Sequence, residues 1–70
     1  MSDKLKHIAY YLKSVRVKAG LSQGQLADKC GFNKNTISRT ERALRWPGTE
    51  LVISWLDACG VDYLEVFRHY

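Results

Sequence analysis

Apolar residues recur along this chain at steps of three and four positions, which is the period of one face of an α-helix. The clearest run spans residues 3–19, where Leu5, Ile8 and Leu12 share a face. Four shorter runs follow it, at residues 23–30, 34–42, 47–59 and 61–67. The alternating pattern of a strand is absent from the sequence, as are repeats and linkers. The pattern therefore predicts one all-α domain over residues 1–70, built from five helices with short connections.

Residues that cap helices stand at the predicted helix ends. Gly20 can end the first helix. Ser22 and Gln25 have the spacing of a capping box at the start of the second helix, and Asn33 is a strong N-cap candidate for the third. Pro47 can open the fourth helix at its first turn. The helix boundaries are thus predicted from local chemistry as well as from periodicity.

The second and third predicted helices have the pattern of a helix-turn-helix, two short helices that cross over a tight turn. Ala27 is small enough to let the third helix pass close to the second. Gly31 can adopt the positive φ of the turn at low cost. Phe32 and Ile37 would then anchor the third helix on the core. The segment from about Ser22 onward therefore predicts a helix-turn-helix.

The outward face of the third helix carries side chains suited to DNA. Arg and Lys match the acceptors of guanine in the major groove, and Asn matches the edge of adenine. Ordinary surface polarity is the alternative explanation for the Asn and Ser in this set. We expect sequence-specific binding to double-stranded DNA, read by Lys34, Asn35, Ser38 and Arg39.

Taken together and in register, these motifs resemble the phage repressor and Cro type of helix-turn-helix regulators. The resemblance runs from about residue 8 to residue 67 and includes Gly20-Leu21-Ser22-Gln23, Leu26-Ala27, Gly31, Thr36-Ile37-Ser38 and Glu41-Arg42. It implies a five-helix bundle of the lambda-repressor-like type, with the helix-turn-helix formed by helices 2 and 3. It also implies a homodimer on a near-palindromic operator, with helix 3 in the major groove.

The resemblance further implies contacts to the DNA backbone. Gln23 stands where the family holds a phosphate at a helix N-terminus. Arg42 and Arg45 follow the recognition helix, where the family contacts the sugar-phosphate chain; both also suit the negative end of the helix dipole. The full backbone set expected is Ser22, Gln23, Asn33, Thr36, Arg42 and Arg45.

A structural ion pair is implied between Arg16 and Glu41, because a buried carboxylate needs a partner. Two residues depart from the family pattern. Thr40 occupies a position that is usually large and apolar, although its hydroxyl can bond the carbonyl one turn back. Ala43 replaces the usual Gly, which leaves the end of the third helix open.

Charge is segregated along the chain. Residues 1–45 carry ten Lys and Arg against three Asp and Glu, whereas residues 46–70 carry one against four. A solvated basic surface would explain solubility but not this segregation. A basic half that contains the helix-turn-helix is the footprint expected of a phosphate-binding surface.

Several other classes of function lack support in the sequence. Cys30 and Cys59 fit apolar core positions better than a disulfide, and the chain lacks ligands for a metal site. The two histidines, His7 and His69, lie near opposite ends, and we expect no catalytic site, no cofactor and no small-molecule ligand.

There is no membrane-spanning run and no signal peptide, so we expect a cytoplasmic protein at the nucleoid.

With no effector domain evident, regulation would depend on DNA occupancy, and we expect a repressor. A second subunit would have to contact the module itself; the dimer candidates are Trp46, Val66, Phe67 and Tyr70. The alternative function is a protein-interaction module, such as an antitoxin whose main task is to bind a partner protein. The cationic outward face of the third helix argues against it. Phage regulators, restriction-modification controllers and antitoxins all fit the sequence equally well.

Overall fold

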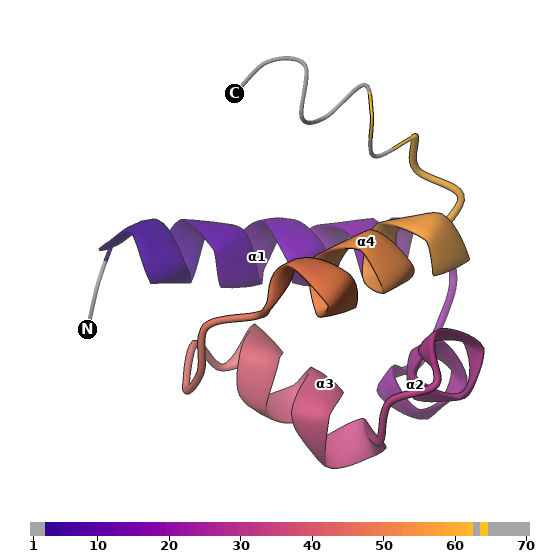
Figure 1. The fold of residues 1–70 in the computed structure, drawn as a ribbon, viewed down its shortest axis with the longest axis horizontal. Helices are drawn as coiled ribbons and strands as arrows, with labels where there is room; N and C mark the ends of the chain where they lie inside the picture. The colour runs from indigo at the N-terminus through magenta and orange to yellow at the C-terminus, as the bar shows by residue number, and fades with distance from the viewer. Residues whose placement is uncertain (1–2, 63, 65–70) are drawn as a thin grey trace.

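The computed structural model describes residues 3–62 and residue 64 of the chain. Four α-helices follow one another in these residues: α1 (Asp3–Lys18), α2 (Gln23–Cys30), α3 (Lys34–Glu41) and α4 (Thr49–Ala58) (Figure 1). This part of the chain contains no strand. The predicted all-α fold with a helix-turn-helix is therefore confirmed, whereas the predicted fifth helix lies mostly outside the described residues.

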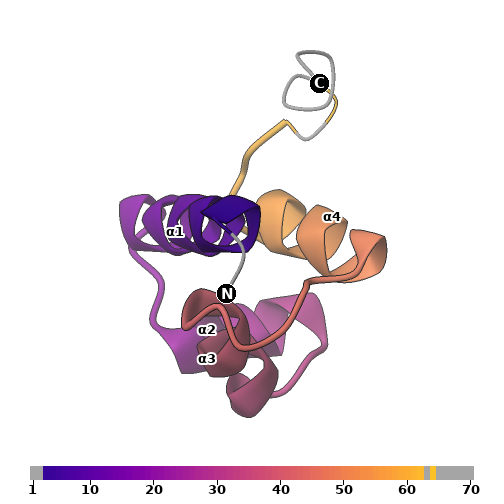
Figure 2. The same cartoon turned by 90° about the vertical axis from the view of Figure 1, so that its left-hand side faces the viewer.

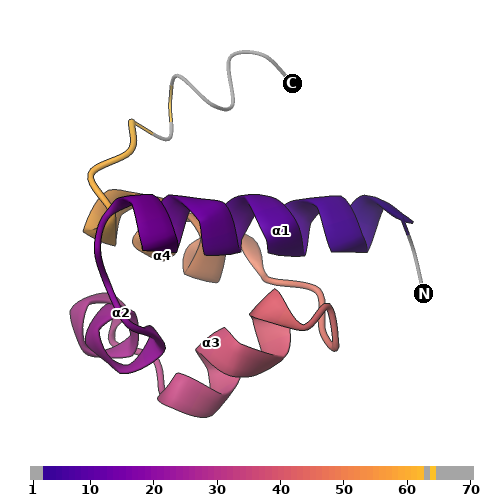
Figure 3. The ribbon, with the colours of Figure 1, turned by 180° about the vertical axis from the view of Figure 1, so that it is seen from behind.

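The helices form two layers. α1 and α4 lie side by side in one layer, and α2 and α3 lie in the other (Figure 2). Seen from behind, the C-terminal end of α3 lies beneath the N-terminal half of α1 (Figure 3). This arrangement leaves one long side of α3 uncovered, which is the side that a ligand could reach.

The core fills the space between the layers. Trp55 of α4 is fully buried there, and its indole Nε1 donates a hydrogen bond to the backbone oxygen of Leu12 at 3.0 Å. Ala27 is buried at the crossing of the second layer, as its small size predicts. Burial of this apolar surface is the main force that holds the layers together. The buried cluster comprises Leu12, Leu26, Ala27, Ile37, Leu51, Trp55 and Leu56.

Local capping chemistry sets the ends of α2 and α3 as predicted. The Ser22 hydroxyl accepts from the backbone N–H of Gln25 at 3.1 Å, and the Gln25 side chain accepts from the Ser22 N–H at 2.8 Å. Asn33 Oδ1 accepts from the N–H of Thr36 at 2.8 Å. Gly31 ends α2 with φ of 77°, a conformation that glycine adopts without steric cost.

The sequence left the end of the third helix open, because Ala43 replaces the usual glycine. α3 ends at Glu41, one residue before the predicted end, and Ala43 adopts a positive φ of 58°. An alanine is strained in this conformation. Its side chain, however, is buried against Leu5 and Ala9 in a small cluster beneath α1, and this packing offsets the strain.

For the fourth helix, the expected start is wrong and the expected apolar stripe is incomplete. Pro47 does not open the helix: α4 begins at Thr49, after an extended Gly48 that serves as its N-cap. The apolar period of the sequence predicts an inward stripe of Val52, Trp55, Leu56 and Cys59 for this helix and omits Leu51. All four of these residues pack in or against the core. Leu51 is more deeply buried than Val52, at 2% exposure, because the rotation of α4 is fixed by the packing of Trp55 between the layers.

Candidate nucleic-acid interface

The inward face of α3 fixes the orientation of its outward face. Ile37 and Thr40 are fully buried against the core. The Thr40 hydroxyl donates to the backbone oxygen of Thr36 at 2.7 Å, which satisfies a polar group that would otherwise be costly to bury. A threonine is therefore accommodated where an apolar residue was expected. With these two positions directed inward, the opposite side of α3 faces solvent.

The predicted base-reading residues lie along this solvent-facing side. Lys34, Asn35 and Arg39 are exposed, and Ser38 is half-buried. None of the four side chains makes a hydrogen bond or ion pair with another described residue. Their donors and acceptors are therefore free to meet a ligand.

The residues expected at the DNA backbone divide into two groups. Ser22, Asn33 and Thr36 are engaged in helix capping, and the Thr36 hydroxyl donates to Asn33 Oδ1 at 3.1 Å. Arg42 and Arg45 are exposed, and their side chains have no partner among the described residues. The two arginines are therefore the members of the set whose charge is unengaged.

Gln23 has a role that the sequence did not suggest. It is the first residue of α2 and is half-buried, and its Nε2 donates to Oε1 of Glu41 at 3.1 Å. The helix start was expected to present this side chain to a phosphate. The amide also ties the start of α2 to the end of α3. Its second N–H and its carbonyl oxygen form no bond within the described residues.

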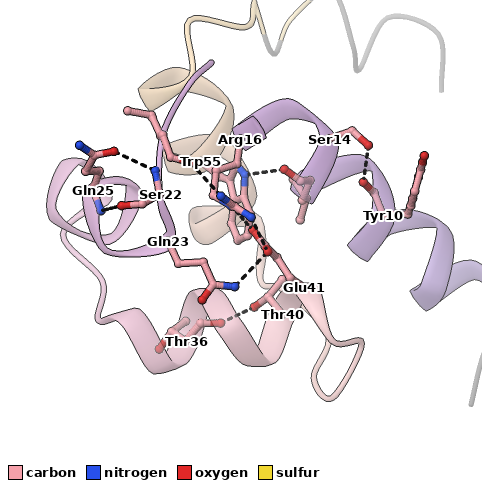
Figure 4. A network of polar contacts seen from close by, with 12 residues as sticks. Tyr10, Ser14, Arg16, Ser22, Gln23, Gln25, Thr36, Thr40, Glu41 and Trp55 are labelled. Carbon is pink, nitrogen blue, oxygen red and sulfur yellow. Dashed lines mark hydrogen bonds and ion pairs between the residues drawn. The ribbon is translucent and has the colours of Figure 1, made fainter. Parts of the chain in front are cut away.

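Arg16 and Glu41 form a nearly buried ion pair beneath this surface (Figure 4). Arg16 Nε donates to Glu41 Oε2, and Nη2 donates to Oε1 at 3.0 Å. Nη1 donates to the backbone oxygen of Leu21 at 2.8 Å. The two side chains are only 12% and 3% exposed. The pair thus joins α1, the connection before α2, and the end of α3, and with Gln23 it holds both helices of the motif in one geometry.

Comparison with known proteins identifies the family. Residues 7–67 match the family model of a helix-turn-helix domain. The chain belongs to this helix-turn-helix family. It is a family of DNA-binding transcriptional regulators and not of enzymes.

A solved structure shows the same fold. It is a mutant of the restriction-modification controller protein C.Esp1396I, which aligns with a TM-score of 0.86 and 24% identity over 97% of this chain and 88% of its own. No curated protein matches the chain.

The cysteines of this helix-turn-helix protein lie away from the outward face of α3. Cys30 and Cys59 are free thiols that are half-buried against the core. Burial raises the pKa of both thiols, and the proximity of Cys59 raises the pKa of Cys30 further. Both therefore remain neutral near pH 7 and act as small apolar residues.

Of the four dimer candidates, only Trp46 lies within the described residues. Trp46, in the connection between α3 and α4, is 54% exposed. The other dimer candidates, Val66, Phe67 and Tyr70, lie outside the described residues. Within the described part of the chain, no cluster of His, Cys, Asp and Glu could hold a metal ion. None of its helices is long and apolar enough to cross a membrane.

Proposed function

We propose that this helix-turn-helix protein is a sequence-specific transcriptional repressor that acts on the nucleoid in the cytoplasm. In this proposal it binds a near-palindromic operator as a homodimer, with α3 of each subunit in the major groove. The observation that carries the proposal is the solvent-facing side of α3. Lys34, Asn35 and Arg39 project there without partners among the described residues, from a helix whose other face is fixed in the core.

The chemistry of these side chains suits base recognition. Asn35 can donate to and accept from the edge of adenine, and Lys34 and Arg39 can donate to O6 and N7 of guanine. Lys34 and Asn35 lie in the first turn of α3 and Arg39 one turn further on. We assign Ser38 to the same face as a shorter, half-buried contributor.

Backbone contacts would hold this helix in register. We assign Arg42 and Arg45 to phosphates because both are exposed cations beyond the end of α3. The side chains of Ser22, Asn33 and Thr36 are used in helix capping. At these residues, the N-termini of α2 and α3 would therefore contact phosphates in place of the side chains. Gln23 would reach a phosphate through the amide N–H that Glu41 leaves free.

The first test begins with selection of bound duplexes from a random DNA pool. Asn35→Ala and Arg39→Ala should then each weaken binding to the selected operator by about 1–3 kcal/mol and relax the preference at particular base pairs. Fluorescence anisotropy titrations against the selected operator and single-base variants measure both effects. If both variants retain wild-type affinity and preference, α3 does not read the bases.

Gln23→Ala and Arg42→Ala serve as the contrasting pair in the same titrations. They should weaken binding to all duplexes alike, because phosphates carry no base identity. Loss of the Arg42 contact should also reduce the slope of log affinity against log salt by about one. A changed base preference with an unchanged slope would contradict the assignment of Arg42 to the backbone.

The homodimer is tested by stoichiometry. One recognition helix reads only a few base pairs, and two-fold repetition would read half-sites about 34–36 Å apart. Sedimentation with the selected operator should give two chains per site, with micromolar or weaker association without DNA as an order of magnitude. Truncation after Glu65 would show whether Val66, Phe67 and Tyr70 contribute, and Trp46→Ala tests the remaining candidate. One chain per site would exclude the dimer.

One observation favours a partner protein as the alternative ligand. Leu44 and Trp46 are 50% and 54% exposed in the connection between α3 and α4. An interaction module such as an antitoxin could use these side chains as apolar anchors. Failure of the wild-type protein to enrich any duplex from the random pool would favour this alternative over the DNA-binding proposal.

A further inference from the structure

A shallow hollow of about 350 Å³ lies between α1 and the end of α3. Lys6, Tyr10 and Lys13 of α1 form one wall, and Glu41 and Arg42 lie on the other side. Two elements that are distant in sequence thus bring three cationic side chains to one concave surface. No residue of the expected DNA-contacting set other than Arg42 lies in this hollow.

The charges in the hollow are not balanced. Among the described residues that line it, Glu41 has the only carboxylate. Both oxygens of Glu41 are already bonded by Arg16 and Gln23. Lys6, Lys13 and Arg42 are exposed and have no ion-pair partner among the described residues. The hollow therefore has an excess of positive charge that an anion would neutralise.

The lysines of this hollow follow one side of α1. Lys6, Tyr10 and Lys13 are spaced four and three positions apart, so they share one face of α1. A second hollow of about 370 Å³ continues along this face, lined by Tyr10 and Lys13 together with Lys18. An open, linear surface of this kind matches an extended polyanion better than a small enclosed anion.

Arg42 makes this surface continuous with the proposed DNA-binding face. It belongs both to the hollow and to the set of residues assigned to the DNA backbone. The end of α3, which Arg42 directly follows, lies beneath the N-terminal half of α1 (Figure 3). A DNA strand held at Arg42 would therefore have its next phosphates close to α1.

We propose that the hollow between α1 and α3 binds backbone phosphates of the DNA that flanks the bases read by α3. Lys6 and Lys13 of α1 and Arg42, which follows α3, are the cations of this site, and the Tyr10 hydroxyl is an additional donor. The inference rests on the proposed DNA-binding function and adds α1 to the contact surface. It makes the affinity depend on flanking DNA without changing the sequence that is preferred.

The test compares two double variants that remove the same charge. Lys6→Gln/Lys13→Gln removes the site, whereas Lys4→Gln/Lys29→Gln removes two exposed lysines that line neither hollow. Binding to the selected operator with long flanks is measured by anisotropy over a series of KCl concentrations. The slope of log affinity against log salt should fall by about two in the first variant and by less than one in the control. Base preference should be unchanged in both variants.

Duplex length provides the second arm. Trimming the flanks to the selected core should lower the affinity of the wild type and of the control, and should leave Lys6→Gln/Lys13→Gln unaffected. Thermal melts by circular dichroism verify that both double variants fold. We expect them to fold, because all four lysines are exposed. Equal slopes for the two double variants would overturn the inference.

The outcomes separate this inference from the proposed function. A wild-type protein that binds no duplex at all contradicts the proposed function before any variant is tested. A wild type that binds its operator, with no specific effect of Lys6→Gln/Lys13→Gln, refutes the flanking site alone. Inorganic phosphate that binds the wild type and not this variant, with the slopes for DNA unchanged, would overturn the assignment to DNA in favour of a free anion.

Discussion

Replacing Arg16 by methionine is expected to lower the free energy of unfolding by about 3–5 kcal/mol, because it leaves an uncompensated buried charge. Glu41 is 3% exposed, and Arg16 supplies two of its three side-chain hydrogen bonds. The backbone oxygen of Leu21 would lose its bond from Arg16 as well. Native proteins are stable by only about 5–15 kcal/mol, so this loss is a large fraction of the total. Chemical denaturation followed by circular dichroism measures it.

Two further variants show whether the charge is responsible. Arg39→Met makes the same chemical change at an exposed arginine that has no partner in the described part of the chain, and it should alter stability by no more than about 0.5 kcal/mol. Arg16→Met/Glu41→Leu removes both charges, and it should recover much of the loss, since apolar replacement of a buried pair is often neutral or stabilising. Equal denaturation midpoints for Arg16→Met and Arg39→Met would contradict the role assigned to the pair.

Replacing Trp55 by alanine is expected to cost about 3–5 kcal/mol, the range for removing a large aromatic side chain from a core. Trp55 is fully buried and belongs to the core cluster, which draws residues from all four helices. Trp55→Phe separates the contributions: it retains most of the apolar contact and loses the hydrogen bond to Leu12, which is worth about 0.5–1.5 kcal/mol. Thermal and denaturant melts should therefore rank the wild type above Trp55→Phe, and Trp55→Ala lowest.

The second tryptophan of the chain provides the matched control. Trp46 is 54% exposed, so Trp46→Ala should change stability by no more than about 0.5 kcal/mol. The comparison holds the substitution constant and varies only burial. If Trp46→Ala proved as destabilising as Trp55→Ala, the division between core and surface described above would be wrong.

Features that depend on neighbours in the sequence were predictable from the sequence alone. The capping box of Ser22 and Gln25 and the N-cap of Asn33 act within a single turn, so their chemistry does not depend on the rest of the fold. The period of three and four positions placed α1, α2 and α3 within about a residue of their observed bounds. The inward positions predicted for Phe32 and Ile37 in the motif left Asn35 and Arg39 on the outward side, and both are exposed.

Local sequence patterns did not determine the buried face or the start of the fourth helix. Val52 and Leu51 are adjacent and equally apolar in kind, and periodicity alone does not decide which faces inward. The choice follows from the rotation of α4, which the packing of Trp55 against Leu12 determines. The helix start was likewise ambiguous, because both Pro47 and Gly48 are compatible with a first turn.

The sequence by itself determined the helices of the motif, their caps and the outward side of α3, because these depend on interactions within four or five residues. Only the tertiary structure decided the rest. Gln23 bonds to Glu41 across 18 positions, and Ala43 is stabilised in a strained conformation by Leu5 and Ala9. Lys6 and Lys13 meet Arg42 only because α1 lies across the end of α3. Such contacts depend on how the two layers dock, and docking is set by the shape of the whole core.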